Sequence, residues 1–393
     1  MQREKMMIFT AITFTFPWIF SYIYQIHYPP HVTALISGSA VISSAFLISW
    51  SAETAEIDIP RSLSLAVVAL LAVLPEYAVD VYFAWMAGKV GGAYTHYATA
   101  NMTGANRLLL GVGWSLVALT AMMKLRKGEV ELDEGLRLET FILLLATLYC
   151  FTIPLKGNIH PVDGLILISL FFLYIYLATK AYREEFELEG VPKYLASFPE
   201  KIRRIIIVTL LFFSAFVIFI SVEAFAEALI GTAKSFGLDE FLMVQWVAPL
   251  ASESPEFVVA MYLVRRMRIT AGMNALISSK VNQWTLLIGC LPIVYSMALL
   301  TPSPLPLDAR QREEILLTAS QSLFGLAIIS NLRINLWEAL ALLTLFLAQF
   351  VYESIETRYI LSIIYIALSI PIIVKERENI RVAMRYITRV INS

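Results

Sequence analysis

The sequence consists largely of long apolar runs, and this pattern restricts the folds open to the chain. A helix needs about 20 apolar residues to cross the hydrocarbon core of a membrane. We predict twelve such spans, at 6–28, 31–51, 62–87, 94–123, 138–154, 160–181, 204–231, 236–264, 270–299, 313–331, 335–351 and 358–374. Backbone in lipid must satisfy its own hydrogen bonds, and the alternation typical of a membrane barrel is missing. The sequence therefore predicts an all-α, polytopic membrane protein of about 12 helices.

The composition agrees with this class and excludes several others. Hydrophobic residues make up 58% of the chain and charged residues 16%, against about 25% charged in an average soluble domain. The net charge of −1 gives no indication of a nucleic-acid partner. Cys150 and Cys290 lie in apolar runs, which excludes a disulfide framework and a cysteine metal cluster. The first run is too long for a signal-peptide core and no small-residue cleavage site follows it, so we predict a retained helix.

The basic residues predict an orientation in the membrane. With the N-terminus placed inside, 22 of the 30 Lys and Arg residues fall in inside segments and six in outside segments. Cytoplasmic loops are enriched in Lys and Arg, so both termini are expected to be cytoplasmic, in a multi-pass protein of the cell (cytoplasmic) membrane. The remaining two, Arg107 and Lys280, lie within predicted spans.

An internal repeat organises the chain. The stretch LPEYAVDVYFAWMAG (74–88) resembles SPEFVVAMYLVRRM (254–267), and a shift of about 177 residues carries five spans of the first half onto five of the second. Because five is odd, the second copy is inverted in the membrane, an arrangement that recurs among transporters. We predict an extra N-terminal helix, a first five-helix repeat, a cytoplasmic connecting loop, a second, inverted five-helix repeat, and an extra C-terminal helix with a basic cytoplasmic tail: 1–30, 31–181, 182–203, 204–352 and 353–393.

Six charged side chains fall inside the repeat spans, where each costs about 2.5–3.5 kcal/mol at the bilayer centre. They are Glu76, Asp80, Arg107, Glu253, Glu256 and Lys280. Such residues are tolerated when they face a cavity and pair with one another. The acids come in two pairs spaced at four and three residues, so each pair shares one helix face.

Proline precedes each key glutamate and frees a backbone carbonyl. Pro75 cannot donate a hydrogen bond to the carbonyl of Leu71, nor Pro255 to that of Ala251. Bare carbonyls beside a carboxylate favour a hard cation such as Na⁺ or Ca²⁺, which prefers oxygen ligands. Amide and hydroxyl groups on the following spans can complete a coordination shell. The candidates are Asn106, Ser279, Asn282 and Gln283.

Plainer interpretations remain open for these residues. A Pro-Glu pair in a membrane helix can be a kink with a structural ion pair, although two at corresponding positions of a repeat favour a shared site. The amide side chains can simply join helices. Arg107 and Lys280 are most simply counter-charges to the acids.

The two Pro-Glu spans, each followed by a polar-faced span, resemble the two α-repeats of the calcium/cation antiporter superfamily, which includes sodium/calcium and proton/calcium exchangers. The first motif of that superfamily is roughly Gly-Thr-Ser-x-Pro-Glu, matched here by LAVLPE (71–76) and ASESPE (251–256). The resemblance assigns metal binding to Glu76 and Glu256, with Asp80 and Glu253 as second carboxylates or proton carriers.

The second motif of the superfamily is roughly Gly-Ser-Asn-x-x-Asn. NMTGAN (101–106) and SSKVNQ (278–283) match it best and put Asn106 and Gln283 at the final amide, with Ser279 as a hydroxyl ligand. A shifted frame favours Asn282 instead, or GANRLL (104–109) in the first copy.

The chain departs from the pattern in ways that affect charge. Ala72 and Val73 replace Thr-Ser, Met102 replaces a ligand serine, and Lys280 replaces an asparagine, while Glu253 adds a carboxylate. Four acids less two bases leave −2, enough for one divalent ion, or for two monovalent ions or protons in alternation.

The resemblance implies a secondary antiporter, with no enzymatic activity and no cofactor, that exchanges calcium or another cation against sodium or protons by alternating access at a midplane carboxylate site. Its partners would be inorganic cations and the lipid bilayer, and the lack of a P-loop argues against a nucleotide. The alternative is a sodium/proton antiporter on the same scaffold, with Lys280 and Arg107 as counter-charges. An intramembrane hydrolase would need a His-rich metal set or a Ser/His pair, and a channel would pass voltage-driven current without a counter-ion.

Overall fold

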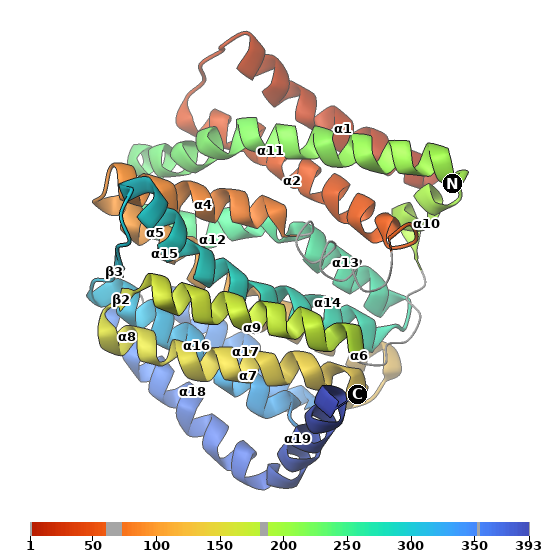
Figure 1. Cartoon of the computed structure of the whole chain (residues 1–393), viewed down its shortest axis with the longest axis vertical. Helices are drawn as coiled ribbons and strands as arrows, with labels where there is room; N and C mark the ends of the chain where they lie inside the picture. The colour runs from red at the N-terminus through yellow and green to blue at the C-terminus, as the bar shows by residue number, and fades with distance from the viewer. Residues whose placement is uncertain (1, 60–72, 181–187, 352–353, 393) are drawn as a thin grey trace. The chain divides into compact units, whose positions relative to one another are not determined.

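The computed structural model describes residues 2–59, 73–180, 188–351 and 354–392, and most of them are helical (Figure 1). Eight helices in this part are long and apolar enough to cross a membrane, and Leu336–Phe350 is a shorter apolar helix. The eight are Gln2–Ile23, Pro30–Ala55, Ala93–Leu125, Glu134–Lys156, Pro161–Lys180, Glu200–Phe236, Ile269–Leu299 and Ile355–Lys375. The predicted all-α, polytopic fold is confirmed, and the count of twelve spans stays a prediction.

The chain packs into two compact units, and each unit takes segments from both halves of the sequence. Unit 1 holds Met1–Phe83 and Arg183–Pro255, and unit 2 holds Ala84–Tyr182 and Glu256–Ser393. Both predicted repeats therefore contribute to both units. The unit boundaries fall within two helices, α4 (Leu74–Lys89) and α13 (Ser254–Arg265), which carry the two Pro-Glu pairs.

Unit 1 is built around two long helices that run in opposite directions. Besides the first part of α4, its helices are α1 (Gln2–Ile23), α2 (Pro30–Ala55), α10 (Gly190–Ala196), α11 (Glu200–Phe236) and α12 (Glu240–Ser252). Asp58, just after α2, binds Arg203 near the start of α11, whereas Gly231 near the end of α11 lies against Pro30. These two helices open the two predicted repeats, and their antiparallel packing agrees with an inverted second copy.

Unit 2 contains two long spans that are each interrupted by a π-helical segment. One is α5–η1–α6 (Ala93–Leu108, Leu109–Trp114, Ser115–Leu125), and the other is α14–η3–α15 (Ile269–Asn282, Gln283–Leu287, Ile288–Leu299). The spans meet where Gly113 packs against Leu276, since a Cβ on Gly113 would lie 3.0 Å from the Leu276 side chain. Single π-helical turns inside α-helices are frequent at functional sites. Both interruptions begin within three residues of a second motif.

The remaining helices of unit 2 pack on these two spans or on one another. They are η2 (Glu134–Leu136, a 3₁₀ turn), α7 (Arg137–Cys150), α8 (Thr152–Lys156), α9 (Pro161–Lys180), α13, α16 (Ala309–Ile329), α17 (Leu336–Val351), α18 (Ile355–Lys375) and α19 (Arg377–Asn392). Helix α9 packs on α15 and η3, and α17 packs on α6 and η1, which are corresponding neighbours in the two repeats. Gly164 of α9 and Gly289 of α15 allow the closest approach, because a Cβ on Gly164 would lie 2.5 Å from the Gly289 carbonyl oxygen.

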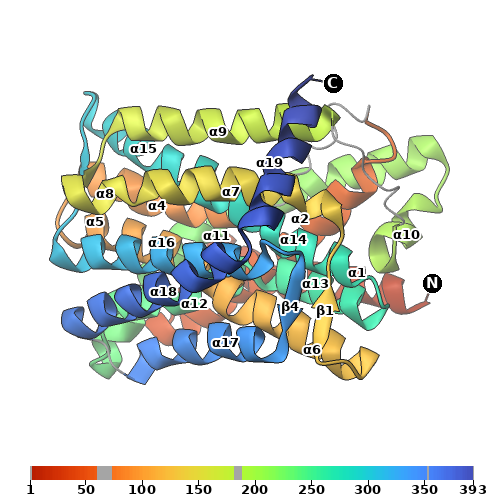
Figure 2. The ribbon, with the colours of Figure 1, turned by 90° about the horizontal axis from the view of Figure 1, so that it is seen from below.

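Two short antiparallel strand pairs repeat the internal symmetry. Strand β1 (Glu129–Glu131) pairs with β4 (Arg333–Asn335), as Figure 2 shows, and β2 (Asn158–Ile159) pairs with β3 (Leu305–Pro306). The shift of about 177 residues carries β1 onto β3 and β2 onto β4. Each pair therefore joins one strand from each repeat, and the two pairs are equivalents of one another.

Candidate ion-binding site

The Pro-Glu helix of the second repeat is broken just before its proline. Helix α12 ends at Ser252, Glu253 lies in the break with 2% of its surface exposed, and α13 begins at Ser254. Pro255 cannot donate to the Ala251 carbonyl, and the Ser254 hydroxyl donates to that oxygen instead, at 3.1 Å. The freed carbonyl is therefore partly satisfied within its own turn. The equivalent carbonyl of the first repeat, on Leu71, lies outside the described residues.

The two acids of the first repeat are buried one helical turn apart. Helix α4 begins at Leu74, and Pro75 fits its first turn because the proline nitrogen has no hydrogen to leave unpaired. Glu76 is 2% exposed and Asp80 0% exposed. Two carboxylates on one buried face repel when both are ionised, unless a cation or a proton offsets the charge. Within unit 1 the same helix is hydrogen-bonded to α11, because the Tyr82 hydroxyl donates to the Glu227 carboxylate at 2.7 Å.

The second motifs of the two repeats meet inside unit 2 through a lysine. The Lys280 ammonium donates to the backbone oxygen of Asn106 at 3.1 Å and to its side-chain Oδ1 at 3.3 Å. Lys280 is 1% exposed and Asn106 0% exposed. The ammonium also lies 5.3 Å from the centroid of the Trp284 ring, within the range of a cation–π interaction. Among the described residues, no acidic side chain forms an ion pair with Lys280, so its partners are neutral.

The other residues of the second motif of the second repeat share this buried region. The Gln283 side-chain amide donates to the Ser279 hydroxyl at 3.5 Å, one helical turn away. Gln283 is 0% exposed, and Ser279 and Asn282 are also buried. Because Asn282 and Gln283 are both inside, burial does not choose between the two frames of the motif. Glu256 lies half-buried in the first turn of α13.

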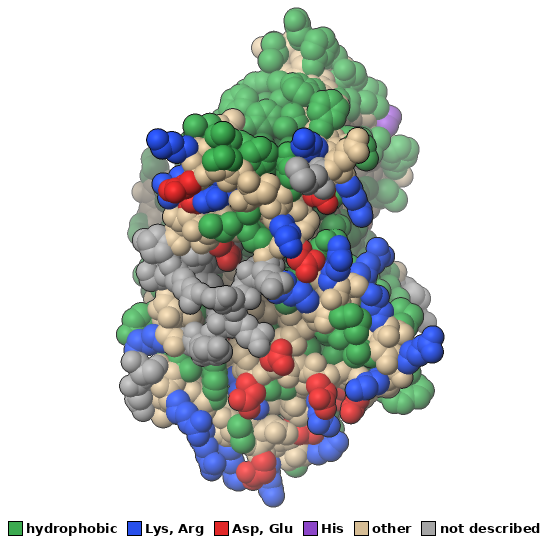
Figure 3. Space-filling view, turned by 90° about the vertical axis from the view of Figure 1, so that its right-hand side faces the viewer, with side chains coloured by type: hydrophobic (Ala, Val, Ile, Leu, Met, Phe, Trp, Pro, Cys, Tyr) green, Lys and Arg blue, Asp and Glu red, His purple; other side chains and the backbone are tan. Residues whose placement is uncertain are grey.

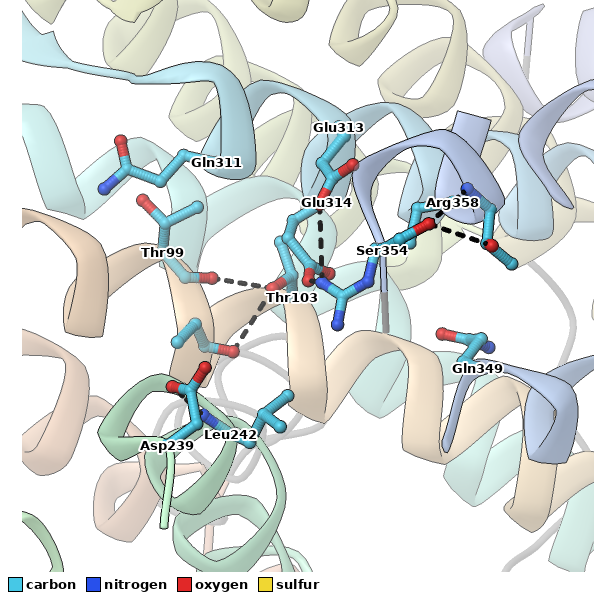
Figure 4. Close-up of polar contacts among 12 residues, drawn as sticks. Thr99, Thr103, Asp239, Leu242, Gln311, Glu313, Glu314, Gln349, Ser354 and Arg358 are labelled. Atoms are coloured by element: carbon cyan, nitrogen blue, oxygen red, sulfur yellow. Dashed lines mark hydrogen bonds and ion pairs between the residues drawn. The ribbon is translucent and has the colours of Figure 1, made fainter. Parts of the chain in front are cut away.

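Arg107 belongs to a buried charge cluster that the sequence did not predict, and Figure 4 shows its other charged members, Glu313, Glu314 and Arg358. The Arg107 guanidinium forms an ion pair with Glu314 of α16 and donates to Gln349 of α17 at 2.6 Å. Arg358 of α18 pairs with the same Glu314 and lies 3.7 Å from Glu313. All four charged side chains are at most 1% exposed. Two arginines and two glutamates thus join α5, α16, α17 and α18, and their formal charges cancel.

The cluster changes the interpretation of three residues. Arg358 is the first residue of the predicted span 358–374, where an arginine is expected at the membrane surface, but it is buried in α18. Glu313 and Glu314 begin a predicted span, and nothing in their spacing marks them as partners of Arg107. A hydropathy pattern locates the end of a span only to within a few residues. It therefore cannot distinguish a carboxylate at the membrane surface from one buried inside the protein. The adjacent acids at the start of an apolar run were the only visible signal.

No group of three or more His, Cys, Asp or Glu side chains in the described ranges is arranged to hold a metal ion. Calcium usually takes six to eight oxygen ligands, from carbonyls and amides as well as carboxylates. Glu76 and Glu256 as metal ligands stay a prediction. So do the ion-binding roles of the other motif residues.

Two long antiparallel helices, a helix broken before its Pro-Glu pair, and buried carboxylates, amides and hydroxyls are features typical of secondary carriers for small cations. Comparison with known families gives the same class and refines it. The model of the family described as sodium/calcium exchanger protein matches residues 31–180 and 206–354, so the chain belongs to that family. The matched blocks nearly coincide with the two predicted repeats. The resemblance to the calcium/cation antiporter superfamily is thereby confirmed.

Solved structures support this assignment. The chain is 58% identical to a structure described as the H⁺/Ca²⁺ exchanger CAX, with a TM-score of 0.96 and 99% of each chain covered. It also matches native YfkE at 17% identity and a TM-score of 0.63, covering 93% of this chain and 100% of that one. The sodium-calcium exchanger NCX_Mj matches at 14% identity and a TM-score of 0.53, covering 81% and 97%. These two show the fold alone. Among curated proteins, the search finds no match.

Proposed function

We propose that this member of the family exchanges Ca²⁺ against protons, with Glu76 and Glu256 as the central ligands. The observation that carries the proposal is the 58% identity, over 99% of both chains, to a structure described as an H⁺/Ca²⁺ exchanger. A carboxylate binds Ca²⁺ when ionised and loses that affinity when protonated. Competition between the ion and protons for the same carboxylates would then enforce exchange, with Asp80 and Glu253 as second carboxylates or proton carriers.

The Lys280–Asn106 contact supports protons over sodium as the counter-ion. Sodium needs several oxygen ligands, and the second motif of the first repeat offers two of them on Asn106. Both of these oxygens accept hydrogen bonds from a tethered ammonium. A cation fixed in this place leaves less room for a free monovalent ion, whereas protons need only the carboxylates.

The charge balance of the motif residues also changes. Arg107 is offset by Glu314 within its own neutral cluster, so it contributes little to the charge around the motif carboxylates. Of the six charged residues of the repeat spans, the four acids Glu76, Asp80, Glu253 and Glu256 and the base Lys280 then remain, with a formal charge of −3. A net charge near −3 in place of −2 suits one Ca²⁺ together with a proton retained on one carboxylate.

A sodium/proton antiporter on the same scaffold is the second candidate. The same lysine favours it, because a tethered ammonium can replace a bound cation when the site is empty. Under this alternative Ca²⁺ would not be carried, and Lys280 would set the pH range of exchange. Neither candidate function needs a cofactor or a nucleotide.

We further propose that both termini lie in the cytoplasm and that the protein resides in the cytoplasmic membrane. The excess of Lys and Arg in alternate loops supports this orientation. The predicted domain boundaries, 31–181 and 204–352, belong to the same proposal.

Calcium uptake into proteoliposomes tests the proposal directly. We expect uptake under an imposed proton gradient, no stimulation by a sodium gradient at constant pH, and loss of uptake in Glu256→Gln. Uptake driven by sodium alone would contradict proton coupling. A protein that moves no Ca²⁺ under either gradient, yet exchanges sodium for protons, would establish the second candidate instead.

A further inference from the structure

The last helix of the chain carries a row of arginines on one face. Arg377, Arg381, Arg385 and Arg389 follow one another at four-residue spacing along α19. Residues four apart are neighbours on a helix surface, and all four side chains are exposed. Glu378 is the one acid within α19, and it pairs with Arg381 at 2.5 Å. In the described part of the chain, Arg377, Arg385 and Arg389 form no ion pair.

The opposite face of α19 is apolar and only partly covered. Ile387 and Val390 are 3% and 8% exposed, and the helix packs on α7 and α9. Met384 and Ile391, on the same side, remain 51% and 52% exposed. A helix with one strongly basic and one apolar face, rather than a helix hydrophobic all round, is typical of segments that lie in the interface of a membrane.

Helix α19 lies across the ends of two membrane helices instead of running beside them (Figure 2). Arg137 at the start of α7 donates to the backbone oxygen of Asn379, and Lys180 at the end of α9 donates to that of Ile391, each at 3.5 Å. Both α7 and α9 belong to spans long and apolar enough to cross a membrane. In a membrane crossed by α7 and α9, a helix that bridges the ends of these two spans would lie along the surface, at the depth of the lipid headgroups.

We propose that α19 binds the anionic phospholipid headgroups of the leaflet beside it. The arginine row supplies planar donors that bind phosphate oxygens through two parallel hydrogen bonds. Met384 and Ile391 are exposed on the same side of α19 as the residues that pack on α7 and α9. Apolar side chains of this kind are more stable against lipid acyl chains than in water. The lower part of the face in Figure 3 shows Lys and Arg side chains interspersed with Asp and Glu side chains, so the attraction to a negatively charged leaflet rests on the arginine row of α19 itself. A soluble acidic protein would match the arginines but not the exposed apolar edge.

Lipid-specific quenching in proteoliposomes tests the proposal without any measurement of exchange. A fluorophore is placed on Met384→Cys, with Cys290 replaced by alanine, in the full-length protein. The same quencher is attached to the headgroup of either phosphatidylglycerol or phosphatidylcholine, at equal content. We expect phosphatidylglycerol to quench about twofold more strongly at low salt, and less so at high salt, because screening weakens headgroup attraction.

Two variants and one control position test whether the arginine row causes the lipid preference. Replacing all four arginines by glutamine should make the two lipids quench equally, while replacing all four by lysine should keep most of the preference. A label on Leu300→Cys, exposed at the end of α15, should show no preference, since it lies at the far end of the α9–α15 pair from α19. Equal quenching in the unmodified helix, or a preference that survives the glutamine substitutions, would overturn the proposal.

Discussion

Lys280 of the second repeat donates hydrogen bonds to both oxygens of Asn106, which belongs to the first repeat. The two residues are buried, and the contact joins the second motifs of the two inverted copies within unit 2. An ammonium in this position acts as a cation that cannot leave. Its removal should therefore change which ions compete at the site, more than whether the protein folds.

Lys280→Ala should make Ca²⁺ uptake sensitive to sodium. The substitution frees the two oxygens of Asn106 for a monovalent cation, so we expect sodium to inhibit proton-driven Ca²⁺ uptake in the variant and to leave the parent unaffected. Lys234→Ala, on a side chain 63% exposed, is the matched control. If the variant instead shifts the pH dependence of sodium/proton exchange more than its maximal rate, the second candidate function is favoured.

Glu76→Gln and Glu256→Gln should each abolish exchange. Glutamine keeps the shape of the side chain but removes the charge that binds a divalent cation and the proton that replaces it. Uptake of Ca²⁺ is measured at equal amounts of reconstituted protein. Glu378→Gln, at a side chain 69% exposed, should retain full activity. Substantial transport in both motif variants would refute the assignment of the site.

Glu314→Gln should destabilise the protein strongly. Arg107 and Arg358 both depend on this carboxylate, and removing one partner of a buried ion pair costs about 3–5 kcal/mol. Thermal unfolding in detergent should show a clearly lower Tm. Arg381→Gln, on an exposed pair, should change the free energy of unfolding by no more than about 0.5 kcal/mol. Similar Tm values for the two variants would mean that the cluster contributes little.

Gly164→Ala should loosen the packing of α9 on α15. The new Cβ would lie 2.5 Å from the carbonyl oxygen of Gly289, so the helices must separate, and overpacking of this kind typically costs about 1–3 kcal/mol. Gly135→Ala is the control, because nothing lies within 4 Å of a Cβ there. Equal Tm values for the two alanine variants would contradict the close approach.

Asp58 should make stability depend on pH in the acid range. Arg203 donates to both carboxylate oxygens, at 2.9 and 2.7 Å, and this holds the pKa of Asp58 below its usual value, against the opposing effect of burial. A lowered pKa in the folded state adds stability above the ordinary pKa of about 3.9, which is lost as the pH falls through the folded value. Asp58→Asn should lower the Tm at neutral pH and make it less dependent on pH between about 6 and 3. A parallel pH profile in the variant would refute the role of Asp58.

Local chemistry made part of this structure predictable. Pro255 cannot continue the hydrogen bonding of a helix, and α12 accordingly ends just before α13 begins. The length of the apolar runs and the five-span repeat predicted membrane helices and an inverted second copy. The opposite directions of α2 and α11 agree with that inversion.

Contacts between distant segments were not predictable from the sequence. Arg107 was expected to balance the motif acids, but the structure pairs it with Glu314, more than two hundred residues away. No periodicity in the sequence predicts this pairing, because it depends on how α16 packs against α5 and α18. The C-terminal tail shows the same limit. The basic charge of the tail was evident from the sequence. Its position across the ends of α7 and α9 was not, because it depends on the burial of Ile387 and Val390 against an apolar surface.

The paired strands make the two repeats dependent on each other. Strand β1 lies before the α7–α8 segment and β2 after it, and each finds its partner in the other repeat. A repeat produced alone would present an unpaired strand at both ends of that segment, open to any other chain. Two separately expressed halves should therefore assemble with one another and not fold independently. A single ancestral copy could have completed both strand pairs only as a dimer whose subunits were inserted in opposite directions.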